Sequence, residues 1–155
     1  MDQTLANIFV EVMSGTHCSH IDLEYVLGEC WSNNCLRRIK ALGIVLAIGN
    51  ENQKARAIGT LEEMLNVGEI RTVESEFALI VVLLQLRKSL TFSLPFRDFV
   101  ICASKSTSPE LRCNAAIILA DIAGYDAAAK NALERLANDK DESVRHNAIT
   151  VLAWI

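Results

Sequence analysis

The residues best suited to metal chemistry lie near the start of the chain. His17, Cys18 and His20 fall within four positions, and Cys30 and Cys35 follow. Imidazole nitrogens and thiolates are the ligands that zinc prefers. However, their spacing, H-C-x-H-x9-C-x4-C, matches no common zinc-site pattern, and Cys30 falls on the apolar face of a predicted helix, where a free thiol behaves as a small hydrophobic side chain. We therefore expect no metal and no cofactor, with zinc on these five residues as the alternative.

A catalytic thiol would need a base beside it. Cys18 adjoins His17, and Cys113 and His146 occupy equivalent positions in two similar segments. A Cys–His pair also needs an oxyanion hole, for which the sequence offers no motif. The chain contains no GxSxG, P-loop, GxGxxG or HExxH pattern. We expect no enzymatic activity, and a zinc- or thiol-dependent enzyme is kept as an alternative.

The composition is that of one compact domain spanning 1–155. Half of the residues are hydrophobic (51%) and 22% are charged, which excludes a disordered chain. The formal net charge of −4 disfavours nucleic-acid binding by phosphate neutralisation. The five cysteines form no CxxC pair, the start lacks a basic signal-peptide region, and the most apolar run, Phe77 to Leu84, is too short to span a bilayer. We expect a cytoplasmic protein that binds neither nucleic acid nor membrane.

Apolar residues recur at helical spacing along nearly the whole chain. Two prolines and seven glycines leave little room for a fold with many turns. Ser108 before Pro109, and Asp141, are strong helix-start signals, and Ser19 begins a capping-box-like start. The expected helices are 4–13, 20–30, 35–49, 52–66, 74–90, 95–103, 109–124, 126–138 and 142–155.

Two stretches of the chain are similar to one another at a spacing of 33 residues. Residues 108–122 read SPELRCNAAIILADI, and residues 141–155 read DESVRHNAITVLAWI. A weaker copy covers 38–49, RIKALGIVLAIG. A two-helix unit cannot bury its apolar face alone, so a repeated pattern predicts antiparallel helix pairs that stack on one another.

Both stretches carry a cap, then Leu or Val, then Arg, then Ala three positions on. The pattern is Leu111-Arg112-x-x-Ala115 in the first and Val144-Arg145-x-x-Ala148 in the second. Followed by an apolar helix, it resembles the HEAT repeats, well over 108–155, weakly over 35–66 and not over 1–30. The resemblance implies an all-α fold, in which antiparallel helix pairs stack as a short right-handed α-α superhelix of about seven or eight helices.

The resemblance also implies roles for charged residues. In HEAT repeats an arginine usually braces one repeat against the next through an acid, which here makes Arg112 and Arg145 the bracing arginines and Asp121 and Asp139 their candidate partners. The second helix of each pair lines the concave side of such a stack. Exposed polar residues there are candidates for partner binding, namely Glu62, Glu63, Lys130 and Glu134.

An acidic surface is predicted near the start of the chain, because residues 1–36 contain five acidic and no basic residues. Asp22, Tyr25 and Glu29 share one face of the second helix, opposite its apolar face. A tyrosine between carboxylates suits recognition of a basic protein. The alternative is a solvated helix face with Tyr25 half-buried.

The last predicted pair lacks its second helix, so Trp154 lies at an uncovered end. Its ring either packs against the preceding helix pair or contacts a partner, which includes a second copy in a homodimer. The further alternative is that the natural protein continues beyond this helix.

These features predict a non-catalytic HEAT-like module that binds another protein. Its size and charge suggest one particular hypothesis, an inhibitor or immunity-type protein that occludes a basic toxin or enzyme. The alternative is an adaptor or assembly subunit that uses its concave face in a larger complex.

Overall fold

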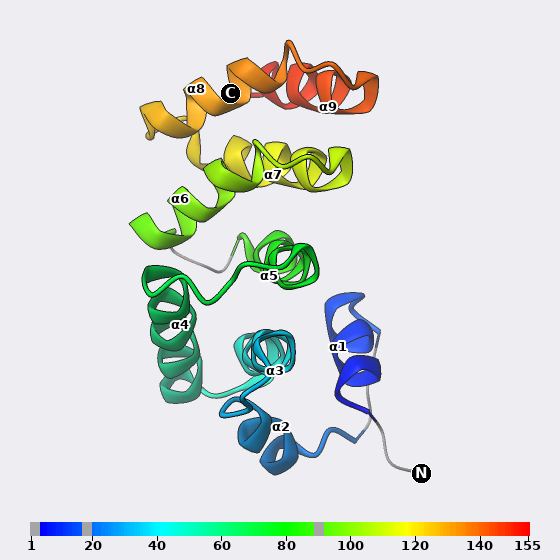
Figure 1. Cartoon of the computed structure of the whole chain (residues 1–155), viewed down its shortest axis with the longest axis vertical. Helices are drawn as coiled ribbons and strands as arrows, with labels where there is room; N and C mark the ends of the chain where they lie inside the picture. The colour runs from blue at the N-terminus through cyan, green and yellow to red at the C-terminus, as the bar shows by residue number, and fades with distance from the viewer. Residues whose placement is uncertain (1–3, 17–19, 89–91) are drawn as a thin grey trace. The chain divides into compact units, whose positions relative to one another are not determined.

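The computed structural model of the chain describes residues 4–16, 20–88 and 92–155. Over these residues the protein contains nine α-helices and no β-strand (Figure 1), which confirms the all-α class. The nine helices correspond to the nine ranges expected from the sequence, one or two more than the superhelix of about seven or eight helices that the resemblance implied. No described helix is both long enough and apolar enough to cross a membrane. The helices are α1 (Leu5–Met13), α2 (Leu23–Glu29), α3 (Cys35–Ile48), α4 (Glu51–Asn66), α5 (Val73–Leu86), α6 (Leu94–Ala103), α7 (Pro109–Ile122), α8 (Ala127–Leu136) and α9 (Glu142–Leu152).

The chain divides into two compact units. Unit 1, Met1–Leu86, contains α1 to α5, and unit 2, Arg87–Ile155, contains α6 to α9. Fully buried aliphatic side chains of α3 and α5 form the centre of the core of unit 1. Those of α7 form the centre of the core of unit 2. That the two units make one repeat domain stays a prediction.

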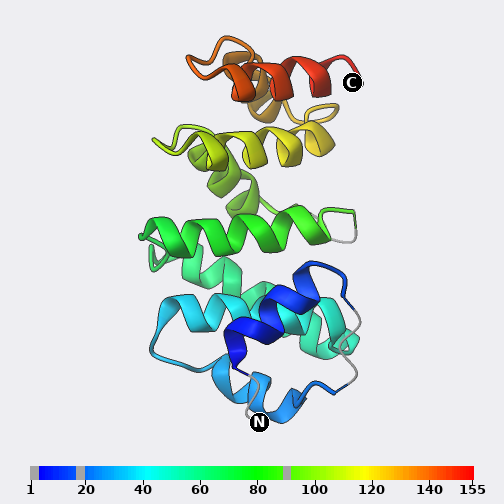
Figure 2. The same ribbon diagram turned by 90° about the vertical axis from the view of Figure 1, so that its right-hand side faces the viewer.

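In unit 1, α3 is the central helix. Helix α4 packs on one side of α3 and α1 on the opposite side, while α5 lies beside α3 (Figures 1 and 2). Six consecutive residues of α3, Ala41 to Leu46, are buried because neighbours cover the helix nearly all round. Helix α1 thus adds a third layer to the helix pairs that the repeat pattern predicts.

Polar side chains fix where the helices of unit 1 begin. The Asp22 carboxylate accepts a hydrogen bond from the Tyr25 backbone N–H at 3.1 Å and caps α2. The predicted start at Ser19 lies outside the described residues. Asn50 and Gln53 form a capping box at the start of α4. Helix α5 ends at Leu86 rather than at the predicted residue 90, because the chain turns at Arg87 and Lys88.

Unit 2 shows that the sequence repeat is a structural repeat. Helices α7 and α9 form one layer, and α6 and α8 form the other (Figure 1). Arg112 and Arg145 are each the fourth residue of their helix, and each donates to the backbone oxygen six residues earlier. The distances are 2.8 Å to Ser106 and 2.7 Å to Asp139. The two copies therefore begin with the same local contact.

Arg112 also forms a buried, bidentate ion pair with Asp139. Its Nε and one terminal nitrogen donate to the two carboxylate oxygens at 2.9 and 3.0 Å, and only 4% of the Arg112 surface is exposed. Asp139 precedes α9, so the pair fastens the start of α7 to the start of α9. Asp121 lies elsewhere, and its carboxylate pairs with Arg87 at 3.0 Å.

Unit 1 contains a related pair, formed by the arginine with which the weaker copy over 38–49 begins. Arg38 is the fourth residue of α3, and its guanidinium lies 2.8 Å from the carboxylate of Glu69, in the loop before α5. The side chain of Glu69 is 43% exposed, whereas that of Asp139 is 12% exposed. The ion pair between the fourth residue of a helix and an acidic residue of a loop thus lies near the surface in unit 1 and is buried in unit 2.

Candidate protein-binding site

A groove in unit 1 lies between α2 and α4, with α3 as its floor. Its cavity volume is about 430 Å³. We call it the α2–α4 groove. It is lined by Leu27, Cys30, Trp31, Leu42, Val45, Gln53, Arg56, Ala57, Gly59, Thr60 and Glu63.

The floor of the α2–α4 groove is apolar. Leu42 and Val45 of α3 are buried there, and Ala57 of α4 is buried beside them. Gly59 leaves part of the wall without a side chain, since a Cβ atom built at this position would have no neighbour within 4 Å. The groove therefore has free space above an apolar base, into which a side chain of another molecule can fit.

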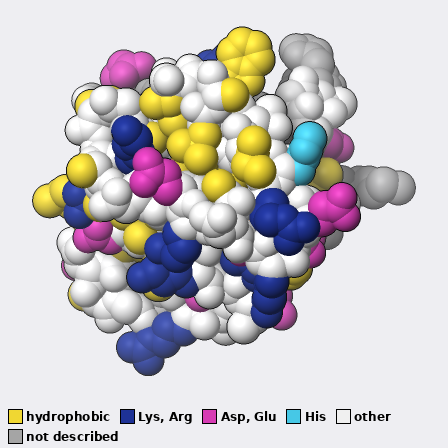
Figure 3. All heavy atoms as spheres, turned by 90° about the horizontal axis from the view of Figure 1, so that it is seen from above, with side chains coloured by type: hydrophobic (Ala, Val, Ile, Leu, Met, Phe, Trp, Pro, Cys, Tyr) yellow, Lys and Arg dark blue, Asp and Glu magenta, His cyan; other side chains and the backbone are white. Residues whose placement is uncertain are grey.

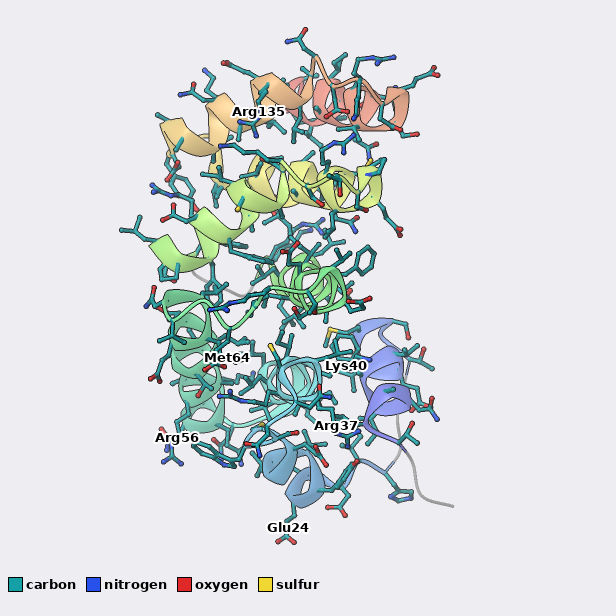
Figure 4. All side chains as sticks on the ribbon, viewed as in Figure 1. Glu24, Arg37, Lys40, Arg56, Met64 and Arg135 are labelled. Carbon is teal, nitrogen blue, oxygen red and sulfur yellow. The ribbon has the colours of Figure 1, made fainter. Side chains whose placement is uncertain are left out.

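Trp31 stands at the edge of this groove and is 78% exposed. It follows the last turn of α2, where no neighbouring helix covers it. Arg56 and Glu63, from α4, are also exposed, and Arg56 points into solvent (Figure 4). Neither of these two charges has an ion-pair partner among the described residues. Exposed Trp and Arg beside an apolar pocket are typical anchors of protein interfaces.

Sequence reasoning missed Trp31. A signal was present, because the tryptophan is followed directly by Ser32-Asn33-Asn34, a polar break between helices. A large ring at such a position does not belong to a helix face that packs against the core. An exposed contact residue is the expectation that follows from that position.

The predicted acidic face of α2 is partly neutralised by α3. Arg37 donates through Nε to the Glu29 carboxylate at 2.9 Å and through a terminal nitrogen to the Tyr25 hydroxyl at 3.2 Å (Figure 4). The hydrogen bond from Arg37 holds the pKa of Glu29 below its ordinary value. Asp22 is exposed, and one of its carboxylate oxygens accepts the hydrogen bond that caps α2. The structure thus brings Tyr25 and Glu29 together, but with the guanidinium of Arg37 bonded to both.

The other predicted contact residues lie in different places. Glu63 lines the α2–α4 groove, whereas its neighbour Glu62 does not. Lys130 and Glu134 are exposed on α8 in unit 2. Trp154 follows α9 and is 85% exposed.

The end of unit 2 that carries α9 has exposed apolar side chains. Ile149, Trp154 and Ile155 are more than half exposed. Hydrophobic side chains are visible on this face beside a histidine (Figure 3). Protein surfaces of this kind often mark contacts with other proteins.

The alternatives of zinc binding and thiol catalysis have no supporting cluster of side chains in the part of the chain that the structure describes. His17 and Cys18 lie outside the described residues. Within residues 4–16, 20–88 and 92–155, no group of three or more His, Cys, Asp or Glu side chains could hold a metal ion. Cys30 is buried and its thiol donates to the Val26 carbonyl at 3.5 Å.

Burial makes Cys30 a poor nucleophile, and this can be measured. Desolvation raises the pKa of its thiol to about 11, so at pH 7.5 it holds on the order of a hundredth of the thiolate of an ordinary cysteine. We expect iodoacetamide to modify the exposed Cys102 well before Cys30, as followed by peptide mass mapping over time. In urea the two should react at similar rates. Rapid modification of Cys30 in the folded protein would show that its thiol is activated, contrary to this expectation.

Residues 97–155 match the family model of the HEAT repeats. The matched segment covers α7, α8, α9 and most of α6, so the HEAT-like character predicted for 108–155 is confirmed. The predicted weak resemblance over 35–66 falls outside the match. Neither a curated protein nor a solved structure matches the chain. HEAT repeats are generally modules of protein–protein interaction and are typically non-catalytic.

Proposed function

We propose that this protein is a non-catalytic binding module whose protein partner docks in the α2–α4 groove. One observation carries the proposal: Trp31 stands 78% exposed at the edge of an apolar groove, beside Arg56 and Glu63, which form no ion pair with any described residue. Exposing an indole ring to water is unfavourable, and covering it with a partner removes that cost. The cysteines that the structure describes are free thiols, which fits a cytoplasmic location. They are Cys30, Cys35, Cys102 and Cys113.

The charge of unit 1 supports a basic partner. Its sequence contains eleven acidic and six basic residues, a net charge of −5, whereas unit 2 contains eight acidic and nine basic residues, a net charge of +1. A negative field around an apolar groove speeds the approach of a basic protein and disfavours acidic ones. An inhibitor or immunity-type protein that occludes a basic toxin or enzyme is the particular role that we propose.

The test is capture of the partner from a lysate of the source with the tagged full chain, three groove variants and one variant with two reversed charges. Trp31→Ala removes the exposed ring, and Gly59→Trp fills the open wall of the groove. Both should reduce the recovery of one basic protein at least tenfold, since truncating an interface tryptophan costs about 2 kcal/mol or more. Gly59→Ala is the matched control and should retain the partner.

The outcome is decisive only if the variants remain folded, which circular dichroism checks. Trp31 is exposed and the Gly59 Cβ position is open, so neither change should disturb the core. A partner recovered equally by all the variants would contradict docking in this groove. Retention after Asp22→Lys with Glu29→Lys would contradict only the requirement for a basic partner.

An adaptor role through unit 2 is the second candidate, favoured by its exposed Ile149, Trp154 and Ile155. Exchanging the charges of Lys130 and Glu134, or replacing Trp154 with Ser, should then lower recovery of several proteins rather than one. Twice the expected mass in light scattering, lost on Trp154→Ser, would instead assign this face to a homodimer.

A further inference from the structure

A second groove in unit 1 lies between α1 and α5, again with α3 as its floor. Its cavity volume is about 670 Å³, larger than that of the α2–α4 groove. Two of its walls come from helices that are far apart in sequence, because α1 crosses the outer side of α3 and reaches α5 (Figure 2). We call it the α1–α5 groove. The residues of its lining that matter for a ligand are Phe9, Val10, Lys40, Glu74, Phe77 and Val81.

Apolar side chains make up most of this lining. Phe9, Met13 and Ala78 are buried, whereas Val10 and Val73 are exposed at the rim. Small-molecule sites typically have volumes of about 300–1,000 Å³, with mostly apolar walls and a few polar groups that fix the orientation of the ligand. The α1–α5 groove has the size and the lining for an acyl chain.

Lys40 supplies the orienting charge. It extends from α3 toward α1 (Figure 4), and its Nζ lies 5.7 Å from the centroid of the Phe9 ring. The ring face holds the ammonium inside the groove by a cation–π contact. No described carboxylate forms an ion pair with Lys40. An incoming carboxylate would therefore form a charge-assisted hydrogen bond in largely apolar surroundings, where such a bond is strong.

Among the described residues that line the groove, Glu74 is the only other charged one, and it is exposed in the first turn of α5. Its negative charge repels a second carboxylate near the rim. The groove therefore favours a ligand with a single negative charge at one end and an apolar body. A cationic amphiphile would be repelled by Lys40, and the second negative charge of a dianion would be repelled by Glu74.

We propose that the α1–α5 groove binds a free amphipathic monocarboxylate of the fatty-acid type, with its carboxylate on Lys40 and its acyl chain against Phe77 and Val81. This site is separate from the α2–α4 groove, so the proposal does not rest on the proposed function. No residue that the structure describes lines both grooves.

The test is a titration of the full, isotope-labelled chain with decanoate, decanol and decyltrimethylammonium below their micellar concentrations, followed by amide chemical shifts. Decanoate should bind saturably and shift amides of α1, α3 and α5 around the groove. Decanol should bind more weakly and the ammonium compound least. Lys40→Met should weaken decanoate about tenfold or more and leave decanol unchanged, since only the charged contact is lost.

Control variants separate a charge effect from a change in folding. Lys40→Arg keeps the cation and should restore most of the affinity, while Glu74→Gln should tighten decanoate binding several-fold. Trp31→Ala and Gly59→Trp should have no effect on decanoate. The proposal is overturned if decanoate shows no saturable shift, if Lys40→Met binds it unchanged, or if decyltrimethylammonium binds as tightly. Shifts spread over the whole chain would likewise overturn it, as adventitious binding only.

Discussion

Replacing Asp139 with alanine is expected to lower the free energy of unfolding of unit 2 by about 3 kcal/mol. The change leaves the guanidinium of Arg112 buried without its bidentate partner, because only the bond to the Ser106 carbonyl remains. It also removes the acceptor for the Asp141 backbone N–H, which lies 2.9 Å from the Asp139 carboxylate. Urea unfolding followed by circular dichroism measures the loss, and amide exchange assigns it to α7 and α9.

Glu69→Ala is the matched control, because it removes the acid from the equivalent pair in unit 1. The carboxylate of Glu69 is far more exposed, so we expect a loss of less than about 1 kcal/mol. Equal losses for the two variants would contradict the role of burial.

The contribution of Asp139 should also depend on pH. Burial alone would raise the pKa of its carboxyl group, but hydrogen bonds from Arg112 and from the Asp141 backbone N–H outweigh burial and lower the pKa. A lowered folded-state pKa stabilises the fold above the unfolded value of about 3.9, and this stabilisation is lost as the pH falls through the folded value. The stability difference between the wild type and Asp139→Asn should therefore shrink below about pH 4.

Two glycine-to-alanine substitutions in helices of unit 1 are expected to change stability in opposite directions. Gly43→Ala should destabilise the protein by about 2 kcal/mol, although alanine is the better helix former. The new Cβ would lie 2.5 Å from Val82 Cγ2 and 3.3 Å from the Phe9 ring. Valine in a helix is nearly fixed in one rotamer, so α3 and α5 would have to move apart.

Gly59→Ala should stabilise the protein by about 1 kcal/mol, since its Cβ meets no neighbour and only the helix propensity changes. Both values can be read from urea midpoints at a common slope. A stabilising Gly43→Ala would mean that the close approach of α3 and α5 is looser than described.

Much of the fold could be predicted from local sequence because its determinants are local. Capping residues such as Asn50, Ser108 and Asp141 lie within three residues of the N–H groups they satisfy, so their sequence positions mark helix starts. The repeat of 33 residues marked the helix pair of unit 2 because stacking selects the same pattern twice.

The site could be predicted only in part, because it depends on which helices meet. The apolar face of α1 predicted that this helix packs against another element. It did not predict that α1 crosses α3 and forms a groove together with α5. The acidic residues of α2 suggested a surface whose negative charge has no cationic partner. However, Arg37 of the next helix forms an ion pair with Glu29. Trp31 lies outside any helix, so helical periodicity does not say where its ring points.

The third layer of unit 1 has a consequence for local opening. Helix α1 has nine residues and buries Leu5, Ile8, Phe9 and Met13 against one side of the unit only. A helix of this length is not stable alone, so it unfolds when it detaches. It can do so while the α3–α4 and α3–α5 contacts persist, at a lower free energy than global unfolding. Detachment removes a wall of the α1–α5 groove and frees the Phe9 ring from Lys40. Occupancy of the groove and the closed state of α1 are therefore thermodynamically coupled, so whatever fills the groove also lowers the population of detached α1.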